Sequence, residues 1–394
     1  MHICLVYDCL YPWTIGGAER WYRALAEGLV AEGHQVTYLT RRQWTRANPP
    51  EIPGVRVVAV SPGSDLYRHG RRTIGAPLRF GAGVAVHLIR HGRRYDAVHI
   101  ASFPYFSVLA VALVRPLRRY QVFVDWHEVW TARYWRSYLG PTKGWVGWRI
   151  QRWCLRLRLP AYCFSALHAR RLRDEGHRAR LTLLRGAYTG RFDPEPPVRA
   201  LPYLLYAGRH IPEKRLTALI PALIEARRSL PHLRALLVGD GPERQQLADL
   251  VAAHDLAAVV DLPGFVDAAT LADAMREALC VVLPSRREGY GMVVIEAAAF
   301  GTPSIVVRDP DNAATELIEE GINGFVAGSV SASDLASAIL RVETAGMALR
   351  QSTAAWFARN IHYLSLAASL PIVIAAYADQ RPPSAPPPVD ARND

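Results

Sequence analysis

The chain has 394 residues, half of them apolar and about a fifth charged, a globular composition long enough for two domains. Lys and Arg exceed Asp and Glu by twelve, which favours a polyanionic partner such as nucleic acid, an anionic membrane or a phosphorylated small molecule. No zinc-finger spacing or aromatic RNA-binding signature is present, so we expect no nucleic-acid partner.

The N-terminal sequence predicts no signal peptide, because no basic segment precedes an apolar one. The uncharged segment 97–114 contains His99 and Pro104, so we expect a strand and a core helix there instead of a membrane span. Five scattered cysteines indicate a reducing compartment. We therefore expect a cytoplasmic protein, with peripheral contact at the inner face of the plasma membrane as the second option.

In the first half of the chain, short apolar runs alternate with an amphipathic pattern. Trp21, Leu25 and Leu29 share one face of a predicted helix over 19–31. Such alternation predicts a parallel sheet covered by helices on both faces. The predicted strands are 3–7, 35–40, 55–60, 97–101 and 121–124.

The pattern restarts after a proline-rich linker at 194–202. We expect an α/β protein of two doubly wound, Rossmann-like domains, 1–193 and 203–360, that face each other across a cleft. The proline-rich tail 379–394 is predicted to be disordered. The second series has strands at 204–207, 235–238, 259–262, 280–284 and 304–307, with helices at 216–229, 242–254, 271–278 and 291–300.

A phosphorylated ligand, one of the partners that the net charge favours, needs positive charge from a metal ion, from Arg and Lys, or from a helix N-terminus. The Asp-x-Asp pattern at 309–311 surrounds a proline, so we interpret it as a turn and expect no metal. The loop after strand 204–207 offers Arg209 as a bidentate fork and Lys214 as a mobile charge. A pair of solvated surface cations is the alternative interpretation.

Two glutamates, Glu288 and Glu296, flank a glycine-rich turn where a strand gives way to a helix. Gly289, Tyr290 and Gly291 would present backbone N–H groups to a hydroxyl or a phosphate. Glu296 lies in an apolar run, where an unpaired charge is costly to bury, so we expect a ligand or a fixed partner. The alternative is an exposed helix face.

Two weaker candidates lie in the first half. Gly16 and Gly17 open the first helix and would let a phosphate approach the backbone, although a structural turn explains them equally well. His127 follows the strand 121–124 and would contact a sugar or orient an acceptor, although a structural histidine is the commoner case.

Together these motifs resemble the retaining glycosyltransferases of family 4 (glycosyl transferases group 1), which have the GT-B fold, over nearly the whole chain. The most specific match is Glu288-x7-Glu296 followed by Ala-Phe-Gly-Thr-Pro. Gly208-Arg209-x4-Lys214, Gly-Asp-Gly-Pro-Glu at 239–243 and Gly-Gly-Ala-Glu at 16–19 follow in specificity.

The resemblance implies a nucleotide-sugar donor, a metal-independent retaining reaction and a glycan, lipid-linked or small-molecule acceptor. It also implies that a last helix over 356–377 crosses back to the first domain. By this resemblance, Arg209 and Lys214 would bind the diphosphate, and Gly17 would cover it. Glu288 would bind sugar hydroxyls, Glu296 would bind the ribose, and the backbone near Val266 would contact the base. His127 would lie near the anomeric carbon and the acceptor.

Two segments depart from the family pattern. Leu-Arg-Gly-Ala at 184–187 replaces an Asn-Gly pair, and Asn-Ala-Ala-Thr-Glu at 312–316 replaces Gly-Gly-x-Pro-Glu near the sugar site. Two other functions stay open: a GT-B nucleotide-sugar 2-epimerase, and an inactive sugar-binding protein.

The segment 134–160 combines tryptophans with arginines, which suits an anionic lipid interface. The interpretation that we favour from sequence is a solvated helix with its tryptophans in the core, or a wall of the acceptor site.

Overall fold

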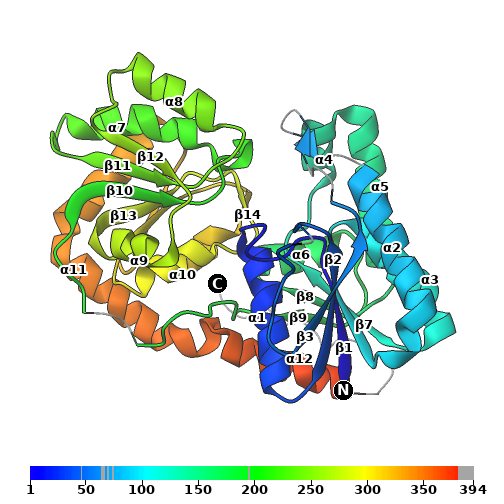
Figure 1. The fold of residues 1–394 in the computed structure, drawn as a ribbon. Coiled ribbons are helices and arrows are strands. Elements are labelled where there is room, and N and C mark those ends of the chain that lie inside the picture. The colour runs from blue at the N-terminus through cyan, green and yellow to red at the C-terminus, as the bar shows by residue number, and fades with distance from the viewer. Residues whose placement is uncertain (46, 64–66, 69–70, 73–74, 194–195, 380–394) are drawn as a thin grey trace. The chain divides into compact units, whose positions relative to one another are not determined.

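The computed structural model describes residues 1–379 except 46, 64–66, 69–70, 73–74 and 194–195. The chain forms two compact units (Figure 1). Unit 1 contains residues 1–185 together with the C-terminal segment from Leu366, and unit 2 contains Gly186–Ser365. The cleft expected between the two domains stays a prediction.

Unit 1 is built on a seven-stranded parallel sheet with the order β3-β2-β1-β6-β7-β8-β9. A short antiparallel pair, β4 and β5, lies outside this sheet. The strands are β1 (His2–Val6), β2 (Gln35–Arg41), β3 (Val55–Ser61), β4 (Tyr67–Arg68), β5 (Arg71–Arg72), β6 (Ala97–Ala101), β7 (Gln121–Trp126), β8 (Ala161–Cys163) and β9 (Leu181–Leu183).

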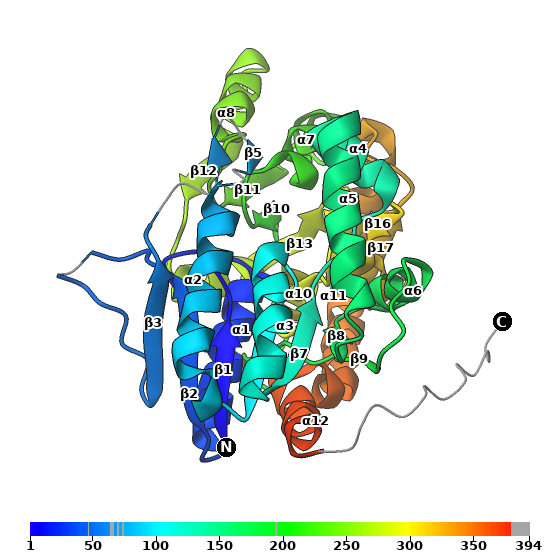
Figure 2. The same ribbon diagram turned by 90° about the vertical axis from the view of Figure 1, so that its right-hand side faces the viewer.

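Helices cover both faces of this sheet. Cys4 and Val6 of β1 pack with apolar residues of α2, α3 and α5, whereas on the other face α1 packs against the C-terminal α12 (Figures 1 and 2). The helices of unit 1 are α1 (Gly17–Ala31), α2 (Gly75–His91), η1 (Gly92–Arg94), α3 (Tyr105–Arg118), α4 (Ala132–Leu139), α5 (Pro141–Arg156), α6 (Ala166–Asp174) and α12 (Leu366–Ala378).

Unit 2 repeats the architecture with a six-stranded parallel sheet of order β12-β11-β10-β13-β15-β17. Leu204 and Tyr206 of β10 point into the core under α7 and α11, while Leu205 between them points into the core under α9 and α10. The strands are β10 (Leu201–Ala207), β11 (Arg234–Val238), β12 (Val260–Gly264), β13 (Ala278–Leu283), β14 (Arg287–Glu288), β15 (Ser304–Val307), β16 (Asp311–Asn312) and β17 (Gly324–Ala327).

The helices of unit 2 include several short 3-10 turns at the strand ends. They are η2 (Pro212–Lys214), η3 (Leu216–Ala218), α7 (Leu219–Arg227), α8 (Arg244–Ala253), α9 (Ala268–Glu277), α10 (Met292–Ala298), η4 (Ala313–Leu317) and α11 (Ala332–Leu364).

The predicted α/β class with two doubly wound sheets is confirmed, and the differences lie at element ends. Unit boundaries fall at 185/186 and 365/366, where the sequence placed domain limits at 193 and 361. The predicted linker 194–202 includes Leu201, which already belongs to β10, and the predicted disordered tail beyond 379 lies outside the described residues. The single helix predicted over 356–377 is divided at Ser365 into α11 and α12.

Two further corrections have local causes. The helix predicted over 271–278 begins at Ala268, because the Asp267 side chain accepts a hydrogen bond from the Thr270 N–H and caps it. The strand predicted over 121–124 continues to Trp126, which places Asp125 inside the sheet. No helix among the described residues has both the length and the apolarity needed to span a bilayer.

Candidate functional site

The loops after β10 and β11 in unit 2 pass very close to each other. The Gly208 N–H donates to the Val238 carbonyl at 3.1 Å, and the His210 N–H donates to the Asp240 carbonyl at 2.8 Å. Gly239 has a φ of +124°, and a Cβ there would lie 1.9 Å from the Gly208 carbonyl oxygen. Only glycine fits this crossing, which fixes the start of the loop that carries Arg209 and Lys214.

Lys214 and Glu288 form an ion pair in the structure. Lys214 ends η2 after β10, and Glu288 lies in β14 after β13, so the two residues come from the carboxyl ends of neighbouring strands. Their side chains are 17% and 11% exposed. The Ser285 hydroxyl donates to Glu288 Oε1 at 2.7 Å and fixes the carboxylate. The pair is therefore well positioned yet open at its edge.

Arg209 belongs to the same edge. It is half-buried, and its carbonyl accepts a hydrogen bond of 2.9 Å from the Tyr206 hydroxyl. Burial raises the pKa of Tyr206 well above its ordinary value, the negative charge of Glu288 raises it further, and the positive charge of Arg209 opposes both. Both charges therefore affect the pKa of the Tyr206 hydroxyl, which indicates that Arg209 and Glu288 lie near the same ring.

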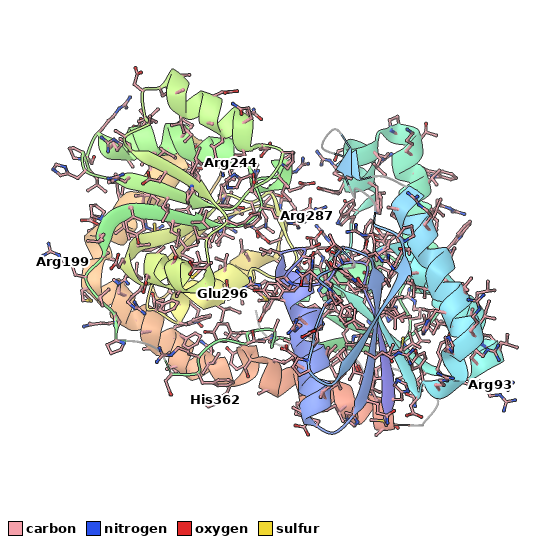
Figure 3. All side chains as sticks on the ribbon, in the orientation of Figure 1. Arg93, Arg199, Arg244, Arg287, Glu296 and His362 are labelled. Carbon is pink, nitrogen blue, oxygen red and sulfur yellow. The ribbon has the colours of Figure 1, made fainter. Side chains whose placement is uncertain are left out.

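Salt bridges attach the loop after β10 to the segments that follow β13 and β15. Arg215 pairs with Asp309 at 3.3 Å and donates through Nε to the Pro284 carbonyl at 2.9 Å. Arg287 lies 3.8 Å from Glu213 (Figure 3). Asp309, the first aspartate of the Asp-x-Asp pattern, therefore forms an ion pair with an arginine. The described residues contain no group of three His, Cys, Asp or Glu side chains arranged to hold a metal ion.

The turn before α10 contains the predicted residues Gly289, Tyr290 and Gly291. Gly291 has a φ of +103°, and a Cβ there would come within 2.7 Å of the Ala314 Cβ. Glu296 is half-buried on α10 (Figure 3). Burial raises the pKa of Tyr188 to about 12, and the charge of Glu296 adds to this rise, so the glutamate faces Tyr188.

Val266 lies between β12 and α9. Its side chain is partly buried against the core, while the neighbouring Phe265 is exposed. The backbone at this point is therefore at the same carboxyl edge of the sheet as Arg209, because β12 and β10 run parallel in one sheet.

The glycines at the start of α1 in unit 1 differ from each other. At Gly16 a Cβ would lie 2.4 Å from Oε2 of the buried Glu19, so a larger residue there would displace the end of that side chain. At Gly17 no atom lies within 4 Å of the Cβ position, and the residue is exposed. Packing within the described chain therefore gives no reason for glycine at position 17.

His127 follows β7 and stacks on Phe164 with ring centroids 4.8 Å apart. Burial lowers the pKa of His127, so the ring is neutral at neutral pH, although Asp125 and Glu128 oppose the shift. Its Nε2 atom has no hydrogen-bond partner among the described residues. A neutral imidazole whose buried Nε2 has no partner in the described chain is suited to form a hydrogen bond with a hydroxyl.

Behind His127 a buried polar network crosses unit 1. Asp125 accepts hydrogen bonds from Trp21 Nε1 at 2.8 Å and from His99 Nε2 at 2.7 Å, and His99 Nδ1 lies 2.5 Å from the Tyr377 hydroxyl. Burial opposes ionisation of Asp125, but the charge and hydrogen bonds of His99, helped by Trp21, outweigh it and lower the pKa. The network joins β6, β7, α1 and α12.

The structure thus brings Arg209, Lys214 and Glu288 together in unit 2, beside the turn that leads to α10. Sequence reasoning missed Ser285 and Asn312. Asn312 donates through Nδ2 to the Val307 carbonyl at 2.8 Å and to the Ser285 carbonyl at 3.2 Å, and β16 pairs with β14. The segment that departs from the family pattern therefore supports Glu288 directly. Its only sequence signal was that departure.

Comparisons with known proteins agree with this architecture. Residues 193–355 match the family model for glycosyl transferases group 1, and residues 16–168 match the model for the glycosyl transferase 4-like domain. The chain belongs to the group 1 glycosyltransferases. It is accordingly an enzyme of the glycosyltransferase class.

Among sequence relatives, the glycogen synthase of Mycobacterium tuberculosis is 28% identical over 334 residues, which are 77% of each chain. The solved structure of sucrose-phosphate synthase from Thermosynechococcus elongatus has a TM-score of 0.80 at 21% identity and covers 96% of this chain and 98% of its own. Anabaena HepE, solved in complex with UDP, has a TM-score of 0.71 at 17% identity, with 96% and 100% covered. At these identities the two structures show the fold, which is GT-B.

Proposed function

We propose that this glycosyltransferase moves a sugar from a UDP- or GDP-type nucleotide sugar to a glycan, lipid-linked or small-molecule acceptor. The transfer retains the anomeric configuration and uses no metal ion. Unit 2 binds the donor and unit 1 the acceptor. The observation that carries the proposal is the ion pair of Lys214 with Glu288, held by Ser285, on the same strand edge as Arg209.

The charges suit a departing diphosphate. Lys214 is a mobile ammonium that now pairs with Glu288, and a diphosphate would compete for it as negative charge develops on the leaving oxygen. Arg209 adds a planar fork for phosphate oxygens. Glu288, fixed by Ser285, then accepts hydrogen bonds from sugar hydroxyls. Glu296, Gly289, Tyr290, Gly291 and backbone near Val266 complete the proposed nucleotide contacts.

Two observations support the finer points. HepE, which shares the fold, was solved in complex with UDP, and this favours a uridine donor. Asp309 is paired with Arg215, so a carboxylate that a divalent ion would need already has a cationic partner. In unit 1 the open Nε2 of His127 and the unhindered backbone at Gly17 are assigned to the sugar and its phosphate.

The test compares the wild type with Lys214→Ala and Glu288→Gln. Each variant should transfer sugar about 10²–10³-fold more slowly, since loss of one well-placed charge-stabilising group typically costs roughly 3–4 kcal/mol of barrier. Initial rates of nucleotide release from UDP-, GDP- and ADP-sugars provide the measurement. Arg234→Ala is the matched control, because Arg234 forms an exposed ion pair with Asp261 elsewhere in unit 2. Near-normal rates in both site variants would refute the assignment.

The same assay separates the competing chemistries. Rates after chelation should equal those before it, and loss that magnesium or manganese restores would contradict metal independence. Proton NMR of the first product formed should show the anomeric coupling of the donor, whereas the opposite anomer would contradict retention. Conversion of the nucleotide sugar to its 2-epimer without acceptor would replace transfer by epimerisation.

A further inference from the structure

Three helices of unit 1, α2, α3 and α5, form one layer on the sheet. α2 packs against α3, and α3 against α5. Figure 2 shows the three helices side by side facing the viewer. Their inward residues, among them Val84 of α2, Val111 of α3 and Leu155 of α5, belong to one core. The opposite sides of these helices form an outward surface, here named the α2–α3–α5 face.

The three helices of this face carry charge of one sign. None of the 35 acidic residues of the chain lies in α2, α3 or α5. The carboxylate that meets the face from a neighbouring element is Glu175, which lies 4.0 Å from Arg152 and accepts a hydrogen bond from Trp148. The cations of the three helices are Arg79, Arg90, Arg115, Arg118, Lys143, Arg149, Arg152 and Arg156.

The face is also unusually apolar for an exposed surface. Leu113 is 81% exposed, Leu117 60%, Trp145 54% and Trp153 52%. Of the eighteen large hydrophobic residues that are exposed in the described part of the chain, eight lie on these three helices. The other four are Leu78, Val86, Ile89 and Val146.

Helical spacing places cationic and exposed aromatic side chains together on one side of α5. Each position of the set after the first lies three or four residues from an earlier one, so the set shares one stripe: Trp145, Arg149, Arg152, Trp153 and Arg156. The Arg149 guanidinium lies over the Trp145 ring, 5.6 Å from its centroid. The buried residues Cys154 and Leu155 lie on the other side of the helix. Sequence reasoning favoured tryptophans in the core, and for Trp145 and Trp153 the structure contradicts it.

We propose that the α2–α3–α5 face docks on an anionic lipid bilayer. Arginines and a lysine on helices that carry no carboxylate attract anionic headgroups, while tryptophans and aliphatic side chains enter the boundary between headgroups and acyl chains. A nucleic acid would use the cations but would leave Leu113, Leu117 and Val86 without a partner. The mixture of charge and exposed aliphatic surface therefore selects the bilayer over other polyanions.

The test measures sedimentation of the full chain with vesicles of phosphatidylcholine that contain none, a fifth or two fifths phosphatidylglycerol. The wild type should bind the anionic vesicles at low salt, hardly bind the neutral ones, and dissociate as salt rises. Trp145→Ser with Trp153→Ser, and separately Leu113→Ser with Leu117→Ser, should each weaken binding about tenfold. Lys143→Glu with Arg156→Glu should weaken it at least as much and flatten the salt dependence.

Matched controls lie in unit 2. Met347→Ser with Tyr363→Ser removes comparably exposed apolar surface, and Arg228→Glu with Arg234→Glu reverses comparably exposed charge. These pairs should leave vesicle binding unchanged, and thermal melts should show every variant folded.

Three outcomes overturn the proposal. They are no binding at low salt, equal loss in the unit 2 controls, and binding that depends on the cations but is unaffected by the serine variants. In the last case, tight binding of a short DNA duplex would assign the face to a nucleic acid.

Discussion

In unit 2 the ion pair at the carboxyl ends of the strands remains partly exposed, whereas in unit 1 the pair formed by Asp125 and His99 is enclosed within the sheet and its helices. Lys214 and Glu288 pair at the border of solvent. Asp125 and His99 pair with both side chains fully buried, beneath a histidine that keeps one nitrogen open. The same sheet architecture thus supplies an accessible pair suited to a ligand and a buried pair suited to holding elements together.

Removing the charge of the buried pair tests most directly whether it stabilises unit 1. Asp125→Asn should lower the free energy of unfolding by about 3–5 kcal/mol, because it leaves His99 and its neighbours without the buried charge that they face. Urea denaturation of the full chain measures this loss. Asp261→Asn, at the exposed pair with Arg234, should cost about 1 kcal/mol or less.

Glu288→Gln removes the charge of the partly exposed pair in unit 2. Its stability should stay close to that of the wild type, because the pair is partly exposed and Ser285 still has an acceptor. If Asp125→Asn cost no more than the exposed control, the contrast between the units would fail.

This contrast also explains what sequence could and could not predict. Parallel strands end at one edge, so two motifs that each follow a strand, such as Lys214 and Glu288, were expected to meet. His99 gave no such signal, because it lies in the middle of an apolar strand. Its pairing with Asp125 depends on the register of β6 against β7, in which Ala101 lies opposite Asp125. The role of Asn312 had no direct signal in the sequence, since its partners are backbone carbonyls, that of Val307 five residues before it and that of Ser285 27 residues before it.

The glycines at the starts of α10 and α1 also differ between the two units. Gly291→Ala should destabilise the protein by roughly 1–3 kcal/mol, because the residue has a positive φ and the added Cβ would meet Ala314. Gly17→Ala should leave stability unchanged or raise it by about 0.5–1 kcal/mol, since the Cβ has room and alanine suits a helix. Urea denaturation provides both values.

Transfer assays then sharpen the assignment. If the backbone at Gly17 contacts the donor phosphate, Gly17→Ala loses activity while it keeps its stability. Full activity in this variant would remove Gly17 from the proposed site and would leave the rest of the assignment intact.

As pH falls, unit 1 should lose stability before unit 2. The expected change for each histidine is smaller than the changes expected for the substitutions above. Burial lowers the pKa of His87 to about 4, and the charges of His91, Arg56 and Arg94 act in the same direction. Burial also lowers the pKa of His127 and His177 in unit 1, and of His210 in unit 2. These rings stay neutral in the folded chain but take up protons in the unfolded chain below about pH 6.5. Stability therefore falls as pH drops from about 6.5 toward 4.

A single substitution isolates the contribution of His87. Its Nε2 lies 2.7 Å from the Tyr95 hydroxyl, so His87→Gln retains a polar partner for the phenol but cannot take up a proton. At pH 5 the variant should lose less stability than the wild type, relative to pH 7, by about 1 kcal/mol after allowance for solvent screening. His254→Gln, at an exposed position in unit 2, is the control. Hydrogen exchange followed separately in the two units measures the difference, and an equal response of both units to acid would show that the buried histidines of unit 1 do not set its acid sensitivity.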